Sequence, residues 1–230
     1  MVRVPSPRGA GAHDRTDQRR RRHPWPARAG PGTGPRAPAG RRCRARDLRA
    51  VDGALYAAVA ATSTPTLDRA LRRLSHAADH SKVSLGIAAA LALGGARARR
   101  AALVGVGAVA VASASTNLLG KRLVHRARPD REAARVTVDR YVPMPRSASF
   151  PSGHTAAAVA FATAVGVVLP EAAVPLGALA SAVGYSRVHT GVHYPGDVAA
   201  GAVLGIASAA AALAAAAPAR VRQPNTFTAW

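Results

Sequence analysis

Residues 101–119 read AALVGVGAVAVASASTNLL, and residues 198–217 read VAAGAVLGIASAAAALAAAA. Neither stretch contains a charged side chain. A helix needs roughly 20 mostly apolar residues to cross the hydrocarbon layer of a bilayer, and both stretches have about that length. They therefore predict two membrane-spanning helices, and this prediction decides the class of fold.

Three shorter apolar segments accompany these two, at residues 83–96, 155–169 and 173–185. Alanine, glycine and serine are frequent in all of them, and small residues let helices approach closely in lipid. A soluble Ala-rich bundle would instead need polar faces at helical spacing, which the five segments lack. The sequence therefore predicts an all-α polytopic membrane helix bundle with about five to six membrane segments.

Two further helices are expected upstream of the apolar segments. Residues 66–80 carry charged side chains at many positions, so we expect an amphipathic helix that lies along the membrane interface. Residues 48–62 also look helical, and the sequence leaves open whether they cross the membrane.

The two ends of the chain differ in composition from the apolar middle. Residues 1–46 carry 13 Arg and 7 Pro but only two acidic residues, so they supply +11 of the formal charge of +21. Such a segment cannot bury enough apolar surface to offset its chain entropy. We therefore predict a disordered tail at 1–46, a helical membrane domain at 47–218 and a short tail at 219–230. The start lacks the pattern of a secretory signal peptide, and we expect no nucleic-acid partner.

The basic loops predict how the chain crosses the membrane. Arg97, Arg99 and Arg100 join the first two apolar segments, and further arginines follow the last one. Excess Lys and Arg marks the cytoplasmic side, so alternating crossings place loops 120–154 and 186–197 together on the opposite side. The prediction is a multi-pass protein of the cell membrane whose two outer loops face away from the cytoplasm. The oligomeric state is left open.

Three clusters of polar residues lie on these two outer loops. They are Lys121 with Arg128-Pro129, Pro151-Ser152-Gly153-His154, and Ser186-Arg187 with His193 and Asp197. Phosphoryl transfer depends on cations and N–H donors that surround the equatorial oxygens of the transferred group. Lys121, Arg128 and Arg187 are expected to supply the cations. Backbone N–H groups of Ser152-Gly153-His154, at the start of a helix, are expected to add donors.

Two histidines in these clusters suggest a division of roles. One must be neutral and nucleophilic, and the other must give and take a proton near neutral pH. His193 stands four residues before Asp197, whereas the sequence places no carboxylate beside His154. We expect this difference to separate the two roles.

The patterns K-x6-R-P, P-S-G-H and S-R-x5-H-x3-D, in this order, resemble the signature of the type 2 phosphatidic acid phosphatase superfamily. That family also includes vanadium haloperoxidases and bacterial acid phosphatases. The resemblance implies that His193 attacks phosphorus, that Asp197 orients its imidazole, and that His154 protonates the leaving alkoxide and then activates water. It implies no metal and no other cofactor. It also implies that the remaining signature residues hold the phosphoryl oxygens: Lys121, Arg128, Ser152, Gly153 and Arg187.

The function implied is a membrane lipid phosphate or diphosphate phosphohydrolase that works through a phosphohistidine intermediate. Its partners would be the bilayer and a lipid phosphate, such as phosphatidic acid, phosphatidylglycerol phosphate, a polyprenyl phosphate or diphosphate, or a polyprenyl-linked phosphosugar. Two alternatives remain open. One is a vanadate-dependent haloperoxidase, and the other is a noncatalytic membrane protein that binds anionic lipid.

Several of these residues also have purely structural interpretations. Asp197 and Ser152 begin helices and would serve there as N-caps. His189 and His193 are spaced like a metal pair, but they lack the H-E-x-x-H pattern, so we predict no metal site. Tyr185 and Tyr194 are interfacial anchors or substrate contacts. Arg146 is a lesser candidate for binding the phosphate. We expect several other charged residues of loop 120–154 to face solvent or lipid headgroups: Arg122, His125, Arg126, Asp130 and Arg131.

Overall fold

The structure of the protein is a computed structural model that describes residues 39–217, except 121 and 123. The chain divides into two compact units, Met1–Arg42 and Cys43–Trp230, and every side-chain contact described below belongs to the second. Most of the predicted N-terminal tail, the C-terminal tail and Lys121 lie outside the described residues. The boundaries predicted for the tails therefore stay predictions.

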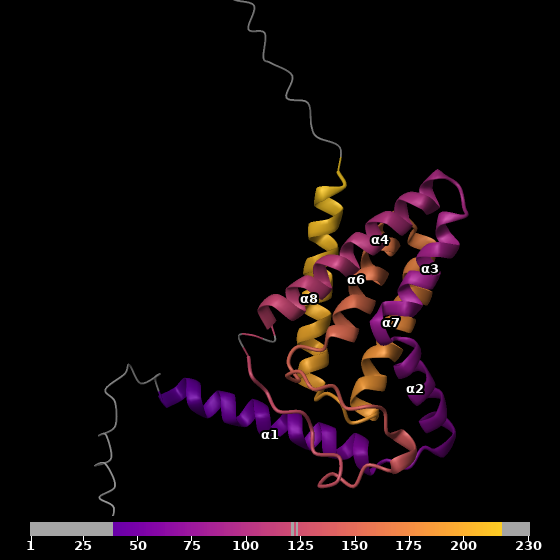
Figure 1. The fold of residues 1–230 in the computed structure, drawn as a ribbon. Coiled ribbons are helices and arrows are strands. Elements are labelled where there is room, and N and C mark those ends of the chain that lie inside the picture. The colour runs from indigo at the N-terminus through magenta and orange to yellow at the C-terminus, as the bar shows by residue number, and fades with distance from the viewer. Residues whose placement is uncertain (1–38, 121, 123, 218–230) are drawn as a thin grey trace, which may run out of the picture. The chain divides into compact units, whose positions relative to one another are not determined.

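The described residues form helices and loops, with no strand among them (Figure 1). The α-helices are α1 (Ala39–Ala61), α2 (Pro65–Ala77), α3 (Lys82–Ala92), α4 (Ala96–Ser115), α6 (Gly153–Val168), α7 (Ala173–His189) and α8 (Pro195–Ala215). Four short helical turns are η1 (Asp79–Ser81), η2 (Thr116–Gly120), η3 (Val138–Arg140) and η4 (Pro170–Ala172). Each segment that the sequence predicts to be helical overlaps one of these helices, so the all-α class is confirmed.

Within the part of the chain that the structure describes, two helical stretches are long and apolar enough to cross a membrane, namely Ala96–Leu118 and Pro195–Ala215. Helix α6 is apolar as well but shorter. These two stretches coincide with the two uncharged segments that decide the fold class. The larger number of five to six membrane segments stays a prediction.

Helix α6 is the centre of the bundle and packs against α4, α7 and α8 (Figure 1). Small residues make the closest approach possible. A Cβ atom added at Gly201 would lie 2.5 Å from the carbonyl oxygen of Ser152, and one added at Gly205 would lie 2.6 Å from that of Ala156. Since no other residue would fit, glycine at these two positions lets α8 lie directly on the backbone of α6. Buried alanines fill the rest of this contact: Ala156, Ala160 and Ala164 of α6, and Ala209 and Ala212 of α8.

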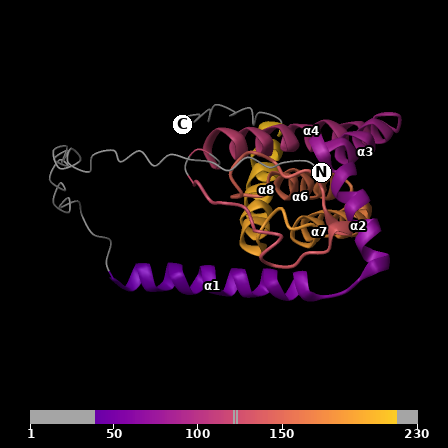
Figure 2. The same cartoon turned by 60° about the horizontal axis from the view of Figure 1, so that its bottom comes forward.

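Helix α1 runs across one end of the bundle (Figures 1 and 2). Tyr56 of α1 is buried there and packs edge-on against Tyr194, with 5.5 Å between the ring centres. Helix α2 lies against α7 and buries one face, which includes Leu71 and Ser75. This pattern fits the amphipathic helix predicted for residues 66–80, and its place at the membrane interface stays a prediction.

A buried ion-pair cluster fixes the long loop between α4 and α6 at the same end of the bundle. Nε of Arg140 lies 2.9 Å from Oδ1 of Asp68, and the remaining guanidinium N–H groups donate to carbonyl oxygens near the end of α1. Nε2 of His189 lies 2.8 Å from the same Asp68 oxygen. The cluster therefore ties α2, η3 and the end of α7 together. The two polar loops thus meet at this end of the bundle, and the prediction that this end faces away from the cytoplasm stays a prediction.

Candidate active site

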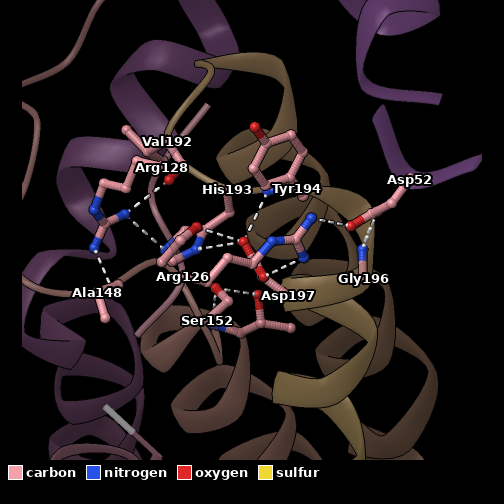
Figure 3. Close-up of polar contacts among 12 residues, drawn as sticks. Asp52, Arg126, Arg128, Ala148, Ser152, Val192, His193, Tyr194, Gly196 and Asp197 are labelled. Atoms are coloured by element: carbon pink, nitrogen blue, oxygen red, sulfur yellow. Dashed lines mark hydrogen bonds and ion pairs between the residues drawn. The ribbon is translucent and has the colours of Figure 1, made fainter. Parts of the chain in front are cut away.

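His193 lies in the short connection between α7 and α8 and is 2% exposed. Its Nδ1 atom is 3.6 Å from Oδ2 of Asp197, and its Nε2 atom is 3.4 Å from Nη1 of Arg128 (Figure 3). The backbone N–H of His193 donates to the carbonyl oxygen of Arg187 at 3.2 Å. The imidazole thus has a carboxylate on one side and a guanidinium on the other.

Asp197 is fully buried in the first turn of α8. Its Oδ2 atom accepts the backbone N–H of Tyr194 at 3.0 Å, as the third residue of a capping box does, and also the hydroxyl of Ser149. Its Oδ1 atom accepts from Nη1 of Arg126 at 2.8 Å. The prediction that Asp197 is the N-cap is wrong, because Tyr194 occupies that position. The carboxylate of Asp197 still stabilises the first turn of α8, and it also faces His193.

Arg126 joins Asp197 to a second carboxylate on α1. Its Nη2 atom lies 2.6 Å from Oδ2 of Asp52, and the backbone N–H of Gly196 donates to the other Asp52 oxygen at 2.7 Å (Figure 3). The guanidinium also stacks on the ring of Tyr194, 4.1 Å from its centre. The prediction that Arg126 faces solvent or headgroups is wrong, because its two carboxylate partners lie far away in the sequence.

Arg128 holds the loop before α6 against the connection that carries His193. Nη1 donates to the carbonyl oxygen of Val192 at 2.7 Å, and Nε donates to that of Ser147 at 3.0 Å. Nη2 contacts the carbonyl oxygen of Ala148 at 3.3 Å. The positive charge of Arg128 therefore lies directly beside the Nε2 atom of His193.

Arg187 is 2% exposed and is anchored by α2. Its Nη1 atom donates to the hydroxyl of Ser75 at 2.6 Å and lies 3.8 Å from Oδ1 of Asp79. Among the described residues, the buried Nε atom of Arg187 has no hydrogen-bond partner. A buried N–H donor of this kind is suited to an anionic oxygen of a ligand.

His154 occupies the first turn of α6, and a carboxylate lies beside it. Its Nε2 atom is 2.8 Å from Oδ1 of Asp79, in η1. The expectation that only His193 has a neighbouring carboxylate is therefore wrong. Asp79 is 75 residues away from His154 in the chain, so no local spacing could indicate the pair.

Ser152 and Gly153 begin α6 in the way that the capping interpretation predicts. The hydroxyl of Ser152 is fully buried and lies 2.9 Å from that of Thr155. The backbone N–H of Ser152 donates to the carbonyl oxygen of Asp197 at 2.9 Å, which links the starts of α6 and α8 directly. A Cβ atom at Gly153 would lie 3.3 Å from the methyl group of Thr116, so space is tight there as well.

A cavity of about 520 Å³ opens beside these residues. Its walls come from η1, the end of α4, the loop before α6, and the ends of α6 and α7. Polar residues on its walls include Asp79, His80, Asn117, His154 and Arg187. The cavity is large enough for a phosphorylated headgroup, and His154 and Arg187 line it.

Burial lowers the pKa of His193 to about 4, and the charges of Arg128 and Arg187 act in the same direction. The nearby carboxylate of Asp197 opposes this shift in pKa without overcoming it. The imidazole is therefore neutral at physiological pH, as a nitrogen nucleophile must be.

The structure brings together seven of the eight predicted site residues, and the eighth, Lys121, lies outside the described residues. Arg131 is a further buried arginine, after Arg140 and Arg187, and the sequence suggested no role in the site for it. It donates to the carbonyl oxygens of Val142 at 2.9 Å and Gly191 at 3.3 Å, so the prediction that it faces solvent is wrong. The other residues expected at the surface are exposed: Arg122, His125 and Asp130. Arg146, the lesser phosphate candidate, is exposed as well.

Within the described residues, no three His, Cys, Asp or Glu side chains are grouped as a metal site would require. His189 is instead bonded to Asp68. Tyr194 packs under Arg126, whereas Tyr185 is 42% exposed. The arrangement offers one neutral buried imidazole, a second imidazole with its own carboxylate, and arginine donors. Such a set can bind an oxyanion and attack it.

Comparison with known proteins agrees with this geometry. The sequence profile of the PAP2 superfamily matches residues 101–220. The decaprenylphosphoryl-5-phosphoribose phosphatase of Mycobacterium tuberculosis (strain CDC 1551 / Oshkosh) is 44% identical over 138 residues, which cover 58% of this chain and 72% of that protein. The protein of the same name from Mycolicibacterium smegmatis is 39% identical over 66% of this chain and 82% of its own.

A solved structure has the same fold. The transmembrane PAP2 type phosphatidylglycerolphosphate phosphatase from Bacillus subtilis superimposes with a TM-score of 0.59 at 23% sequence identity. The superposition covers 73% of this chain and 85% of that one. It extends beyond the three motifs to most of the helical bundle.

Proposed function

This chain belongs to the PAP2 superfamily and is a phosphatase, and on that premise we propose that it hydrolyses a polyprenyl-linked phosphosugar through a phosphohistidine on His193. The observation that carries the proposal is the position of His193 between Asp197 and Arg128. Nucleophilic attack on a phosphate ester needs a neutral imidazole, a carboxylate that stabilises the positive charge on the ring, and a cation that binds the phosphate.

The substrate class follows from the relatives and from the cavity. The mycobacterial relatives are named for a phosphate on a sugar that is joined to a polyprenyl chain. The cavity of about 520 Å³ has polar walls and could hold a phosphorylated sugar. The other substrates considered are ranked below this class: phosphatidic acid, phosphatidylglycerol phosphate, and polyprenyl phosphates or diphosphates.

In the first half of the reaction, Nε2 of His193 attacks phosphorus and the bond from phosphorus to the leaving oxygen breaks. His154 gives its proton to that oxygen, so an alcohol leaves. Arg128 and Arg187 hold the equatorial oxygens, with Lys121 and the helix start at Ser152-Gly153 as further donors. Asp197 stabilises the positive charge that develops on the imidazole of His193.

In the second half, a water molecule attacks the phosphorus of the phosphohistidine. His154, now neutral, takes a proton from that water, and the bond between phosphorus and nitrogen breaks. Inorganic phosphate leaves, and His193 returns to its neutral form. This sequence needs no group beyond the chain, the substrate and water.

A narrow apolar hollow of about 20 Å³ lies next to the polar cavity. It lies between α3, α6 and α7, with lining residues such as Ile87, Phe161 and Leu179. His154 and Ser81 line both this hollow and the polar cavity. We propose that the hydrocarbon chain of the substrate leaves the active site along this hollow.

We propose five to six membrane segments, with the active site on the extracytoplasmic side. The turn between α3 and α4 lies at the opposite end of the bundle from the polar loops (Figure 1), and the start of α4 that follows it carries Arg97, Arg99 and Arg100. A test uses a Cys43→Ser background with a new cysteine at exposed Arg146 or exposed Arg99. In intact cells, a membrane-impermeant maleimide should label only the cysteine at position 146. Labelling of position 99 alone would reverse the orientation.

The deciding experiment measures phosphate release from a panel of lipid phosphates by the full chain in detergent. The wild type should release phosphate, and His193→Ala should not. The matched control is His125→Ala, because His125 is exposed. A phosphoenzyme trapped by rapid quenching from the wild type, and missing from His193→Ala, would identify the intermediate.

The same panel separates the two alternatives. If no lipid phosphate is hydrolysed but vanadate-loaded protein oxidises halide with peroxide, the site is that of a haloperoxidase. If neither activity is found while the protein binds anionic vesicles, it is a noncatalytic lipid-binding protein. Either result would overturn the proposed function.

A further inference from the structure

Asp79 lies outside the three sequence motifs, but it is at the wall of the active-site cavity. It is the first residue of η1, between α2 and α3. The next two residues, His80 and Ser81, have φ angles of 56° and 58°. Non-glycine residues rarely adopt this left-handed conformation, and it persists only where the surroundings enforce it. The sharp turn directs the Asp79 carboxylate toward the start of α6.

The carboxylate of Asp79 contacts three side chains. Oδ1 lies 2.8 Å from Nε2 of His154 and 3.8 Å from Nη1 of Arg187, and Oδ2 lies 3.7 Å from Nδ1 of His76. Only the contact with His154 has the length of a hydrogen bond. His154 is thus held through Nε2, and Nδ1 is its other ring nitrogen.

Burial lowers the pKa of His154 to about 4, the charges of Arg187 and His193 act in the same direction, and Asp79 opposes this shift. The titratable groups that face it come from three elements: Asp79 and His80 of η1, Arg187 of α7, and His193 of the α7–α8 connection. Arg187 is a buried cation. A nearby cation disfavours a second positive charge, whereas a carboxylate within hydrogen-bond distance favours it. Asp79 is the one group in this set that stabilises an imidazolium.

We propose that Asp79 is a positioning residue that holds the imidazole of His154 in place and favours its protonated form. The inference rests on the proposed function, in which His154 donates a proton to the leaving oxygen. That proton passes from Nδ1 of His154 as the bond between phosphorus and oxygen breaks and the bond from phosphorus to Nε2 of His193 forms. The two histidines then each have a carboxylate, Asp197 for the nucleophile and Asp79 for the proton donor.

The leaving group supplies the decisive test. An alkyl alcohol is a poor leaving group and needs the proton, whereas a nitrophenol-type aryl leaving group departs without it. The experiment compares an alkyl phosphate with an activated aryl phosphate that carries the same hydrocarbon chain. Rapid-quench, single-turnover measurements give the rate at which His193 is phosphorylated, for the full-length wild type and for Asp79→Asn.

For Asp79→Asn, we expect the phosphorylation rate with the alkyl phosphate to fall roughly 10- to 100-fold. With the aryl phosphate it should fall less than about threefold, and KM should change little for either. The basic limb of the pH–rate profile with the alkyl phosphate should move to lower pH. Asp79→Glu should recover part of the rate, because it restores the negative charge.

The control is Asp139→Asn, since Asp139 is an exposed carboxylate in η3. It should leave both rates unchanged. An equal loss of rate with both substrates, or an unmoved pH profile, would show that Asp79 only maintains the structure and would overturn the inference. A wild-type rate in Asp79→Asn would also overturn it. Failure of the wild type to hydrolyse any phosphate would instead reject the proposed function itself.

Discussion

The Nδ1 atom of His193 lies 3.6 Å from Oδ2 of Asp197, which is an ion-pair distance but too long for a strong hydrogen bond. That Asp197 oxygen also accepts from Tyr194 and Ser149, so the carboxylate is fixed in place. When Nε2 of His193 bonds to phosphorus, positive charge develops on the ring and strengthens the attraction to Asp197. The pair is therefore arranged to interact most strongly after the attack has begun.

Asp197→Asn should lower kcat by roughly 10²- to 10⁴-fold, because the developing charge on His193 loses its counter-ion. The amide oxygen of asparagine can still accept the backbone N–H of Tyr194, so the start of α8 should remain folded. Steady-state kinetics and a thermal melt in the same detergent check this expectation. Near-normal kcat in a folded variant would remove Asp197 from the mechanism.

Arg126→Gln should destabilise the fold by about 2 kcal/mol, because it leaves the carboxylates of Asp52 and Asp197 close together without their shared cation. It should also lower kcat, since Asp197 would no longer be held in place. The double variant Arg126→Gln/Asp52→Asn should recover part of the stability. A double-mutant cycle of melting temperatures measures this coupling, and additive losses would contradict it.

The buried imidazole of His193 predicts an acid-sensitive fold. Its pKa falls from 6.5 to about 4 in the folded protein, so between these pH values the unfolded chain binds more protons than the native one. Stability should therefore decrease as the pH falls from 6.5 to 4, by up to about 3 kcal/mol from this residue. His193→Gln should weaken this dependence, which melting curves at several pH values would show. An identical pH dependence in the variant would contradict the assignment.

Arg187→Lys should lower kcat/KM by roughly 100-fold or more, because a single ammonium cannot replace the guanidinium. Nη1 of Arg187 is committed to Ser75, while the buried Nε has no protein partner among the described residues. The ammonium of a lysine can replace either the contact with Ser75 or the contact with phosphate, but not both. Activity close to the wild-type value would show that Arg187 does not bind phosphate through its fork.

Ala158→Phe should narrow the apolar hollow, which Ala158 lines from a partly exposed position on α6. We expect kcat/KM to fall roughly 10-fold for a long-chain lipid phosphate and to stay unchanged for a short water-soluble one, because only the long chain needs the hollow. The control is Ala207→Phe, on an exposed face of α8. Equal effects of Ala158→Phe on both substrates would place the hydrocarbon chain elsewhere.

The helices could be predicted from the sequence because long runs of Ala, Val, Leu and Gly leave few other structures possible in a bilayer. The signature residues were found for a related reason, since each motif is local and has fixed spacing. The supporting residues could not be found in this way. Asp52 and Asp79 meet their partners across 74 and 75 residues of chain, and only the packing of α1 and η1 brings them together.

The buried cluster of Asp68, Arg140 and His189 illustrates the same limit. In the sequence, Asp68 looks like one more charge on an amphipathic helix, and Arg140 looks like one more basic residue in a polar loop. Their burial depends on how α2, η3 and α7 pack, which hydrophobic periodicity does not specify. Charged residues in basic, low-complexity sequence are therefore the hardest to assign without a structure.

The direct backbone link between Ser152 and Asp197, with Gly201 and Gly205 just below it, has a practical meaning for protein engineering. Mutant libraries that aim to change the preferred lipid headgroup can vary the residues of the cavity wall, but they should keep Gly201 and Gly205 unchanged. A single added methyl group there would separate the two halves of the catalytic machinery while leaving every reactive side chain in the sequence. The inactivity of such variants would then be attributed wrongly to the catalytic residues, when its cause is the changed packing of α6 and α8.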